Sequence, residues 1–323
     1  MLPERGIVRI GCEIEVASFR DRYTYQQVAA ELVDAGAMEG TAADWQEYHR
    51  YNCDCGYGCL RVKRGDLLVP PIVSMQYDAS LPTLGAEFIV SPVLLVNGME
   101  EMRRIWEIVT EHAEWRDDLP AIRGQHMASP SIHLHVSATM PGGEKKMVSY
   151  GKRPVIDPRA DILHALSLFG PELLLLSDVE QFRRGLAFRQ PWREADGRDN
   201  HHGFVHVKRV DPGKMTYIEW RMFEAAYDNW AYLETAAYLA AGLTRALLAP
   251  ETLDLLMAEG YRDKVDDAAI RAAIAGNDTA AALRLASPRR LAALQDLLGE
   301  ELDDDDYGQA LVRQRFNEVI ERV

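Results

Sequence analysis

The chain has 323 residues, 47% of them hydrophobic and 27% charged, which is enough to bury a large core in one domain or one domain with an appendage. Its net charge of −14 at pH 7 and pI near 5.1 argue against a surface that binds nucleic acid by neutralising phosphates. No apolar run is long enough to span a membrane and residues 1–5 lack the apolar core of a signal peptide, so we expect a cytoplasmic protein without membrane partners.

The first informative run is Gly11-Cys12-Glu13-Ile14-Glu15-Val16, which predicts a strand. Side chains two apart on a strand share a face, so Glu13 and Glu15 lie together, opposite the apolar residues. Two carboxylates this close repel each other unless a positive charge lies between them, which indicates a hard cation such as Mg²⁺. A half-buried strand with a polar outer face is the alternative.

Residues 24–37 have apolar side chains at helical spacing and predict a helix, and a cysteine-rich loop follows at about 49–66. There His49, Cys53, Cys55 and Cys59 offer one imidazole and three thiolates, the donor set of a structural zinc site. A glycine-rich hairpin with free thiols is the alternative. We do not expect a catalytic cysteine, which would need a depressed pKa and a neighbouring base.

Phe88, Ile89 and Val90 predict a second strand, which Pro92 should end. Glu87 begins this strand as a lone acid among apolar residues, and Asp78 lies shortly before it. An amphipathic helix is predicted over residues 99–115.

Residues 131–137 alternate strictly and predict a strand with Ser131, His133, His135 and Ser137 on one face. Two imidazoles on one face are candidate metal ligands, although a single histidine on a strand is more often structural.

A helix is predicted over residues 159–180, followed by a cationic and aromatic segment that contains Arg183, Arg184 and Arg189. In an acidic protein this local reversal of sign indicates an anionic ligand, with a solvated loop as the alternative. Residues 216–223 alternate again and place Glu219 and Arg221 on one face, where they either serve a site or form a surface ion pair.

From residue 228 the chain is rich in alanine and leucine and predicts four or five helices. The breaks are predicted at Pro250, Gly260, Gly276-Asn277-Asp278, Pro288 and the acidic run 300–306. We therefore predict a catalytic domain over residues 1–248 and a C-terminal helical region over residues 249–323.

Five of these segments, taken in order, resemble the amidoligase family, whose fold is similar to the catalytic domains of glutamine synthetase and glutamate-cysteine ligase. The resemblance covers about residues 7–245. The segments are 11–15, 78–80 with 85–92, 133–137, 182–188 and 218–221. An Asn of the family pattern is replaced by His206, and Ala225-Ala226 replaces a Gly-Thr-like pair, which concerns substrate identity more than metal binding.

The resemblance implies that Mg²⁺ ions around the phosphates of ATP are held by a set of acids and one histidine. That set is Glu13, Glu15, Glu87, His133 and Glu219. It also implies that His135 and Ser137 lie near the nucleotide and that Arg221 steadies the transferred phosphoryl group. Arg183, Arg184 and Arg189 would face phosphate or a substrate carboxylate, which arginine binds in a bidentate manner.

We accordingly expect an α+β fold, with a curved, mainly antiparallel, glutamine synthetase-like sheet, helices on its convex face and a C-terminal helical appendage. The expected function is an ATP- and Mg²⁺-dependent carboxylate–amine ligase that acts through an acyl phosphate on a glutamate-like small molecule or peptide, with Asp78 as candidate base. The alternatives are a phosphotransferase to a guanidino or amine nitrogen and a non-catalytic binding or assembly protein. The oligomeric state is left open.

Overall fold

The fold is described from a computed structural model, in which the residues fall into two compact units. One unit comprises residues 10–133 and 225–230, and the other comprises residues 1–9, 134–224 and 231–323. The described residues are 8–16, 22–38, 45–48, 59–62, 73–76, 86–113, 131–139, 148–150, 153–155, 162, 165–166, 168–177, 205–209, 215–224, 229–262, 269, 284–302 and 305–323.

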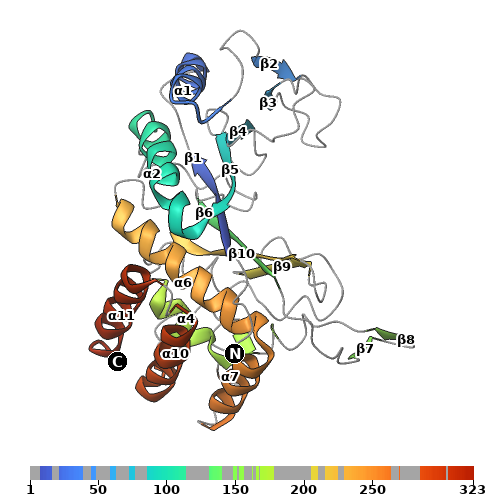
Figure 1. The fold of residues 1–323 in the computed structure, drawn as a ribbon, viewed down its shortest axis with the longest axis vertical. Helices are drawn as coiled ribbons and strands as arrows, with labels where there is room; N and C mark the ends of the chain where they lie inside the picture. The colour runs from blue at the N-terminus through green and yellow to red at the C-terminus, as the bar shows by residue number, and fades with distance from the viewer. Residues whose placement is uncertain are drawn as a thin grey trace. The chain divides into compact units, whose positions relative to one another are not determined.

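A six-stranded sheet joins segments that are far apart in the sequence (Figure 1). Its hydrogen-bonded order is β4 (Val73–Gln76), β5 (Ala86–Leu94), β1 (Arg9–Val16), β6 (Ser131–Thr139), β10 (Met215–Glu224) and β9 (Val205–Arg209). The pairs β4–β5 and β9–β10 are antiparallel. Two small antiparallel hairpins are formed by β2 (Trp45–Tyr48) with β3 (Cys59–Val62) and by β7 (Val148–Tyr150) with β8 (Arg153–Val155). The predicted α+β class is confirmed, whereas its glutamine synthetase-like identity stays a prediction.

The strands predicted from alternation each have one apolar and one polar face, as expected. Apolar residues of β1, β6 and β10 are fully or almost fully buried on one face, and the acids and histidines occupy the other. The apolar set is Ile10, Cys12, Ile14, Val16, Ile132, Leu134, Val136, Ile218, Trp220 and Met222. Because the polar face is also largely buried, its charged groups need partners rather than water.

In the first unit, α1 (Arg22–Asp34) and α2 (Leu95–Glu111) confirm the two helices predicted there. They pack against each other, and His112 Nε2 donates to a Glu31 carboxylate oxygen at 2.8 Å. The α2 helix also contacts β5, with Met102 and Ile105 fully buried.

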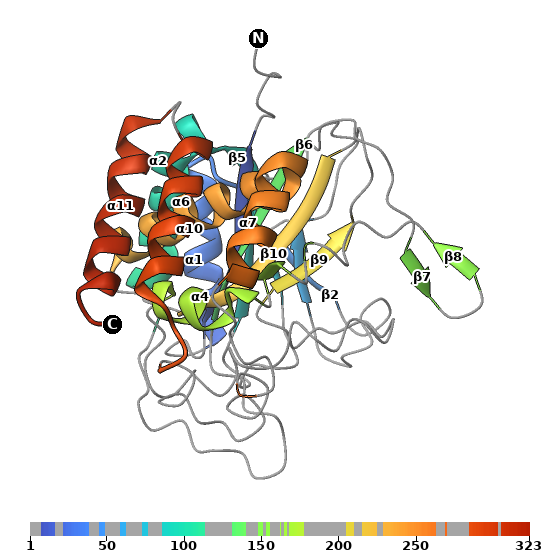
Figure 2. The same cartoon turned by 90° about the horizontal axis from the view of Figure 1, so that it is seen from below.

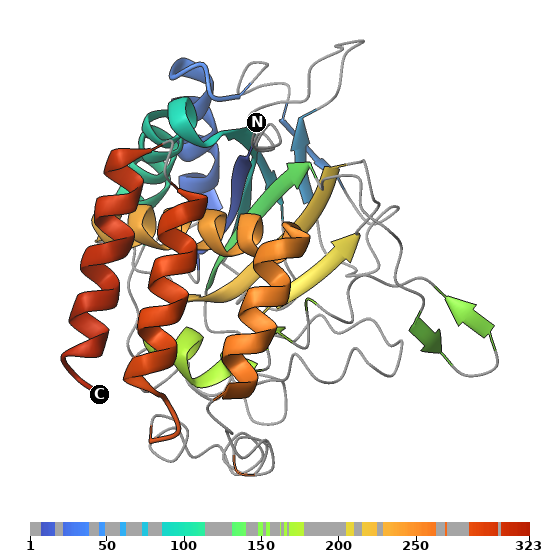
Figure 3. The same cartoon turned by 60° about the horizontal axis from the view of Figure 1, so that its bottom comes forward.

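In the second unit, α6 (Trp230–Leu248) lies against β10 through its buried face. The indole N–H of Trp220 donates to Thr244 Oγ1 at 3.0 Å, and both residues are fully buried. The helices α7 (Pro250–Arg262), α10 (Pro288–Glu301) and α11 (Asp306–Ile320) stand side by side beyond α6 (Figure 3). Since α6 is covered on both sides, it is apolar around almost its whole circumference from Leu233 to Leu248.

Two predicted breaks are wrong. Strand β5 continues through Pro92 to Leu94, because its pairing with β4 ends at Val90 and no ladder bond to β4 is required of Pro92. Helix α7 continues through Gly260 to Arg262, which shows that one glycine weakens a helix without ending it. None of the helices in the described ranges is long and apolar enough to cross a membrane.

A short helix, α4 (Gly170–Leu176), lies beside α10 and α11 (Figure 2). Its Glu172 is fully buried and accepts bonds from Arg290 Nε at 3.0 Å and Nη2 at 2.5 Å, and from the Ser287 backbone N–H at 2.8 Å. Burial raises the pKa of Glu172, while Arg290 lowers it less strongly. The buried negative charge of Glu172 therefore depends on Arg290 for its compensation.

Replacing Arg290 with methionine should destabilise the protein by about 3–5 kcal/mol at neutral pH, because it leaves a buried carboxylate without its counter-charge. Since the folded-state pKa of Glu172 is raised, protonation favours the folded state and the penalty should shrink as the pH falls. Denaturant unfolding of Arg290→Met at about pH 8 and about pH 5 measures this. In the double variant with Glu172→Gln the pH dependence of the penalty should vanish.

Gly308 in α11 is required for close packing, since a Cβ there would overlap the ring of Tyr238. Gly308→Ala should therefore destabilise the protein by about 1–3 kcal/mol. The control is Gly299→Ala, whose Cβ would have Gln309 Nε2 as nearest neighbour at 3.9 Å. It should be neutral or stabilise by up to about 1 kcal/mol through helix propensity. Equal melting temperatures for the two variants would contradict this packing argument.

Candidate active site

The glutamates of β1 meet the first histidine of β6 in the first unit. His133 Nδ1 donates to a Glu13 carboxylate oxygen at 2.8 Å, and His133 Nε2 lies 3.7 Å from a Glu15 oxygen. All three side chains are largely buried. The imidazole thus lies between the two carboxylates, where positive charge is most needed.

Cys12 points to the opposite, apolar face of β1 and is fully buried. Burial, and secondarily the charge of Glu13, raises the pKa of its thiol. Its burial is the packing role that the alternation of residues 11–16 predicts for Cys12.

On β10, Glu219 and Arg221 share the polar face. Arg221 Nε donates to a Glu219 carboxylate oxygen at 2.6 Å. The Glu219 side chain is fully buried, whereas 18% of the Arg221 side chain is exposed. This is a buried pair and not the weak surface ion pair that the sequence left open.

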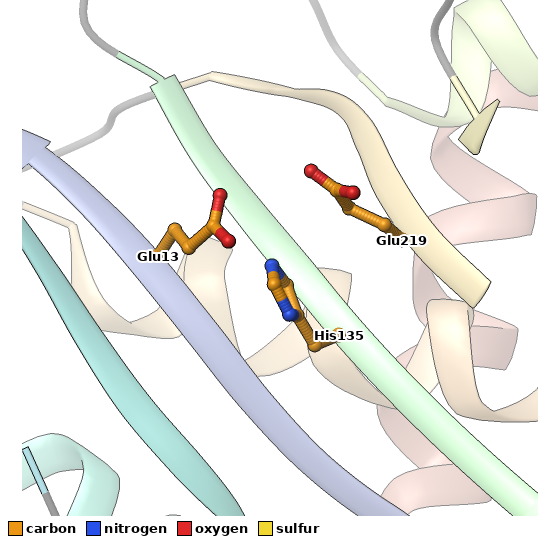
Figure 4. A group of neighbouring side chains, drawn as sticks. All are labelled: Glu13, His135 and Glu219. Carbon is orange, nitrogen blue, oxygen red and sulfur yellow. The ribbon is translucent and has the colours of Figure 1, made fainter. Parts of the chain in front are cut away.

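Three side chains from neighbouring strands converge on the polar face (Figure 4). One ligand atom each of Glu13 on β1, His135 on β6 and Glu219 on β10 lies within 4.8 Å of the other two. Ligands of an octahedral cation with bonds of about 2.1 Å lie about 3.0 Å apart when adjacent and about 4.2 Å apart when opposite. The spacing and the two carboxylates therefore fit a hexacoordinate divalent cation after small side-chain adjustments.

The resemblance to amidoligases implies a metal-binding role for His133 and a place near the nucleotide for His135. The geometry adds His135 to the candidate ligands and gives His133 two carboxylate neighbours. The alternation of β6 already places both imidazoles on one face, and so makes His135 a possible ligand. It does not tell which of the two histidines binds the metal.

The remaining described residues of the predicted site lie on β6 and on two further strands, β5 and β9. Glu87 on β5 and Ser137 on β6 are buried, with 7% and 4% of their surface exposed. The Cα of His206 on β9 pairs with that of Glu219, so this departure from the family pattern lies next to the buried acid. The acids Glu87, Glu13, Glu15 and Glu219 thus come from strands β5, β1 and β10, with β6 lying between β1 and β10.

Several predicted residues lie outside the described ranges, and their roles stay predictions. They are Asp78, Arg183, Arg184, Arg189, His49, Cys53 and Cys55. Cys59 begins strand β3, so its backbone alone is described, and the zinc site of the cysteine-rich loop also stays a prediction.

A second group of ligand-type side chains was not predicted. Glu31 on α1 and Glu111 and His112 at the end of α2 have ligand atoms within 4.8 Å of one another. Glu111 is exposed, and such groups commonly hold no ion. We assign it the role of a contact between the two helices.

No family model and no curated protein sequence matches the chain. Among solved structures, the apo structure of GmaS, gamma-glutamylmethylamide synthetase, is similar over 99% of this chain and 70% of its own, at 12% sequence identity and a TM-score of 0.41. A likeness of that degree is too low to assign a family or a chemistry. The family and the chemistry of this protein are therefore argued from its own residues.

If the polar face binds a divalent cation, Mg²⁺ or Mn²⁺ should stabilise the protein against unfolding, because the cation relieves repulsion among the buried acids. At a hundredfold excess over the Kd the gain is about 2.7 kcal/mol. Glu219→Gln should weaken cation binding, measured by calorimetry, at least about tenfold. The control is Glu107→Gln, which alters an exposed glutamate paired with Arg103. Equal affinity in all three proteins would contradict the assignment.

Proposed function

We propose that the protein is an ATP- and Mg²⁺-dependent ligase that joins a carboxylate, on a glutamate-like small molecule or peptide, to an amine. The observation that carries this proposal is the convergence of Glu13, His135 and Glu219 on a largely buried polar face. The choice of ATP-dependent ligation as the reaction at this site is based on the five ordered segments that resemble amidoligases.

Glu13, Glu219 and His135 would hold Mg²⁺ in this proposal, with Glu15, Glu87 and His133 completing the ligand set. When bound, Mg²⁺ neutralises phosphate charge and orients the triphosphate for in-line transfer. The protein supplies the carboxylates from three strands: Glu13 and Glu15 from β1, Glu87 from β5 and Glu219 from β10.

In the first step an oxygen of the substrate carboxylate attacks the γ-phosphorus of ATP, the bond from that phosphorus to the bridging oxygen breaks, and ADP leaves. Arg221 is held on the acid-bearing face by Glu219, where its guanidinium would stabilise charge on the transferred phosphoryl group. Glu219 thereby orients the arginine as well as serving as a candidate ligand.

In the second step the amine nitrogen attacks the acyl carbon, the carbon–oxygen bond breaks and inorganic phosphate leaves. The nitrogen must lose a proton, for which Asp78 is our candidate base. His135 and Ser137 would contact the nucleotide. Arg183, Arg184 and Arg189 would bind phosphate or the substrate carboxylate through bidentate hydrogen bonds.

The deciding experiment incubates the protein with Mg²⁺, ATP, a panel of glutamate-like carboxylates and a panel of amines, and analyses the products by mass spectrometry. A new amide formed with equal amounts of ADP and phosphate supports the ligase. A stable phosphorylated nitrogen without free phosphate would instead identify a phosphotransferase. Absence of Mg²⁺-dependent ATP binding in calorimetry would overturn the proposal and favour a non-catalytic binding or assembly protein.

Arg221→Ala should lower kcat about 10²- to 10³-fold, because it removes a charge that acts mainly on the transition state. The affinity for Mg²⁺ alone should change far less than in Glu219→Gln, since Arg221 is not a ligand. Arg103→Ala, which removes an exposed arginine of α2, is the matched control. A variant that keeps the wild-type kcat would show that Arg221 has no part in phosphoryl transfer.

A further inference from the structure

Strand β10 is attached to helix α6 through the residue that separates Glu219 from Arg221. Trp220 and Thr244 are both fully buried, and the indole N–H of Trp220 donates to Thr244 Oγ1 at 3.0 Å. A buried indole N–H loses free energy unless it finds an acceptor, and the Thr244 hydroxyl oxygen supplies one. Because side chains alternate along a strand, Trp220 lies on the apolar face while Glu219 and Arg221 lie on the polar face.

The ladder between β9 and β10 is irregular directly before Glu219. The Cα of Tyr217 pairs with that of Arg209 and the Cα of Ile218 with that of Val207, so one step along β10 corresponds to two steps along β9. Such an irregularity disrupts the local backbone pairing and increases the twist of a strand. The pairing with β9 therefore defines the direction of the polar side chains that follow less firmly than a regular ladder would. A side-chain attachment on the opposite face of β10 adds a constraint at this point.

The turn of α6 that carries Thr244 is itself fixed on the C-terminal helices. Arg245 Nη1 donates to the carbonyl oxygen of Glu301, the last residue of α10, at 2.6 Å. At Gly242 the two segments approach so closely that an added Cβ would lie 3.2 Å from Leu302 Cδ1. Both contacts limit movement of this turn, so the acceptor for the Trp220 indole has a defined position.

We propose that Thr244 is a positioning residue for phosphoryl transfer. Its hydroxyl group, through Trp220, sets the rotation of β10 about its own axis and thereby the directions of Glu219 and Arg221. Arg221 Nε donates to a Glu219 carboxylate oxygen at 2.6 Å, so a change in either direction misaligns this bond. A displacement of about 1 Å in a catalytic group can lower a rate about a hundredfold. The inference rests on the proposed function for what the two side chains act on.

The first test observes these side chains in the protein without ligand. Thr244→Val keeps the shape of the side chain but removes the acceptor, and Thr244→Ser keeps the acceptor. In nitrogen–proton NMR spectra, Thr244→Val should shift the indole signal of Trp220 and raise the solvent exchange rate of the Arg221 Nε–H about two- to tenfold. Thr244→Ser should return both toward their wild-type values. Spectra of Trp220→Phe and Arg221→Lys identify the two signals.

The Nε–H of Arg290, which donates to the buried Glu172 at 3.0 Å, is the internal control and should keep its exchange rate in every variant. Trp220→Phe removes the donor instead of the acceptor, so it should also raise the exchange rate of the Arg221 Nε–H. Wild-type exchange of the Arg221 Nε–H in both Thr244→Val and Trp220→Phe would overturn the inference.

The second test separates positioning from stability. Thr244→Val should weaken Mg²⁺ binding in calorimetry about two- to tenfold and lower kcat about tenfold or more. The control is Gly308→Ala, which disturbs packing against Tyr238 and should lower the melting temperature while leaving Mg²⁺ affinity and kcat unchanged. A lower melting temperature of Thr244→Val with wild-type Mg²⁺ affinity and kcat would show a purely structural role and overturn the inference. If the wild-type protein binds no Mg²⁺ and forms no product, the proposed function fails, and the NMR comparison still decides whether Thr244 positions the two side chains.

Discussion

The electrostatic repulsion among buried carboxylates is the constraint on which this structure depends. Glu13, Glu15, Glu87 and Glu219 lie on β5, β1 and β10, and all are largely or fully buried. Desolvation and like charge both disfavour such a set, so it persists only where positive charge compensates it. Arg221 supplies part of that charge to Glu219, and His133 donates a hydrogen bond to Glu13. The divalent cation of the proposed function would add to this compensation.

Burial of the opposite, apolar face of the sheet offsets the free energy lost by burying these acids. Its residues on β1, β6 and β10 are apolar and essentially without exposure, so their burial offsets the desolvation of the acids. The bond from Trp220 to Thr244 fixes β10 on α6, and α6 in turn contacts α10, where Arg245 Nη1 donates to the Glu301 carbonyl oxygen at 2.6 Å. This packing holds the part of β10 that carries Glu219 and Arg221 in place within its own unit.

The same principle of compensated charge recurs away from the site. Glu172 and Arg290 form a buried pair, and Arg315 is buried against carbonyl groups of α4. Such contacts contribute little net stability compared with apolar packing, but they tolerate few alternative arrangements. They connect α4 to α10 and α11, which places helices from the end of the chain in direct contact with a segment from its middle.

The sequence by itself determined which residues share a face. Alternation with period two paired Glu13 with Glu15, His133 with His135 and Glu219 with Arg221, and the helical periodicity of α1 and α2 was equally readable, because both patterns are local. The tertiary structure alone decided that β6 lies between β1 and β10, that β5 continues past Pro92, and that His135 converges with Glu13 and Glu219 while His133 contacts Glu13. It also decided the partners of Glu172 and Arg315. Alternation carries no information about which strand becomes a neighbour, since that choice depends on packing between residues that are far apart in the sequence.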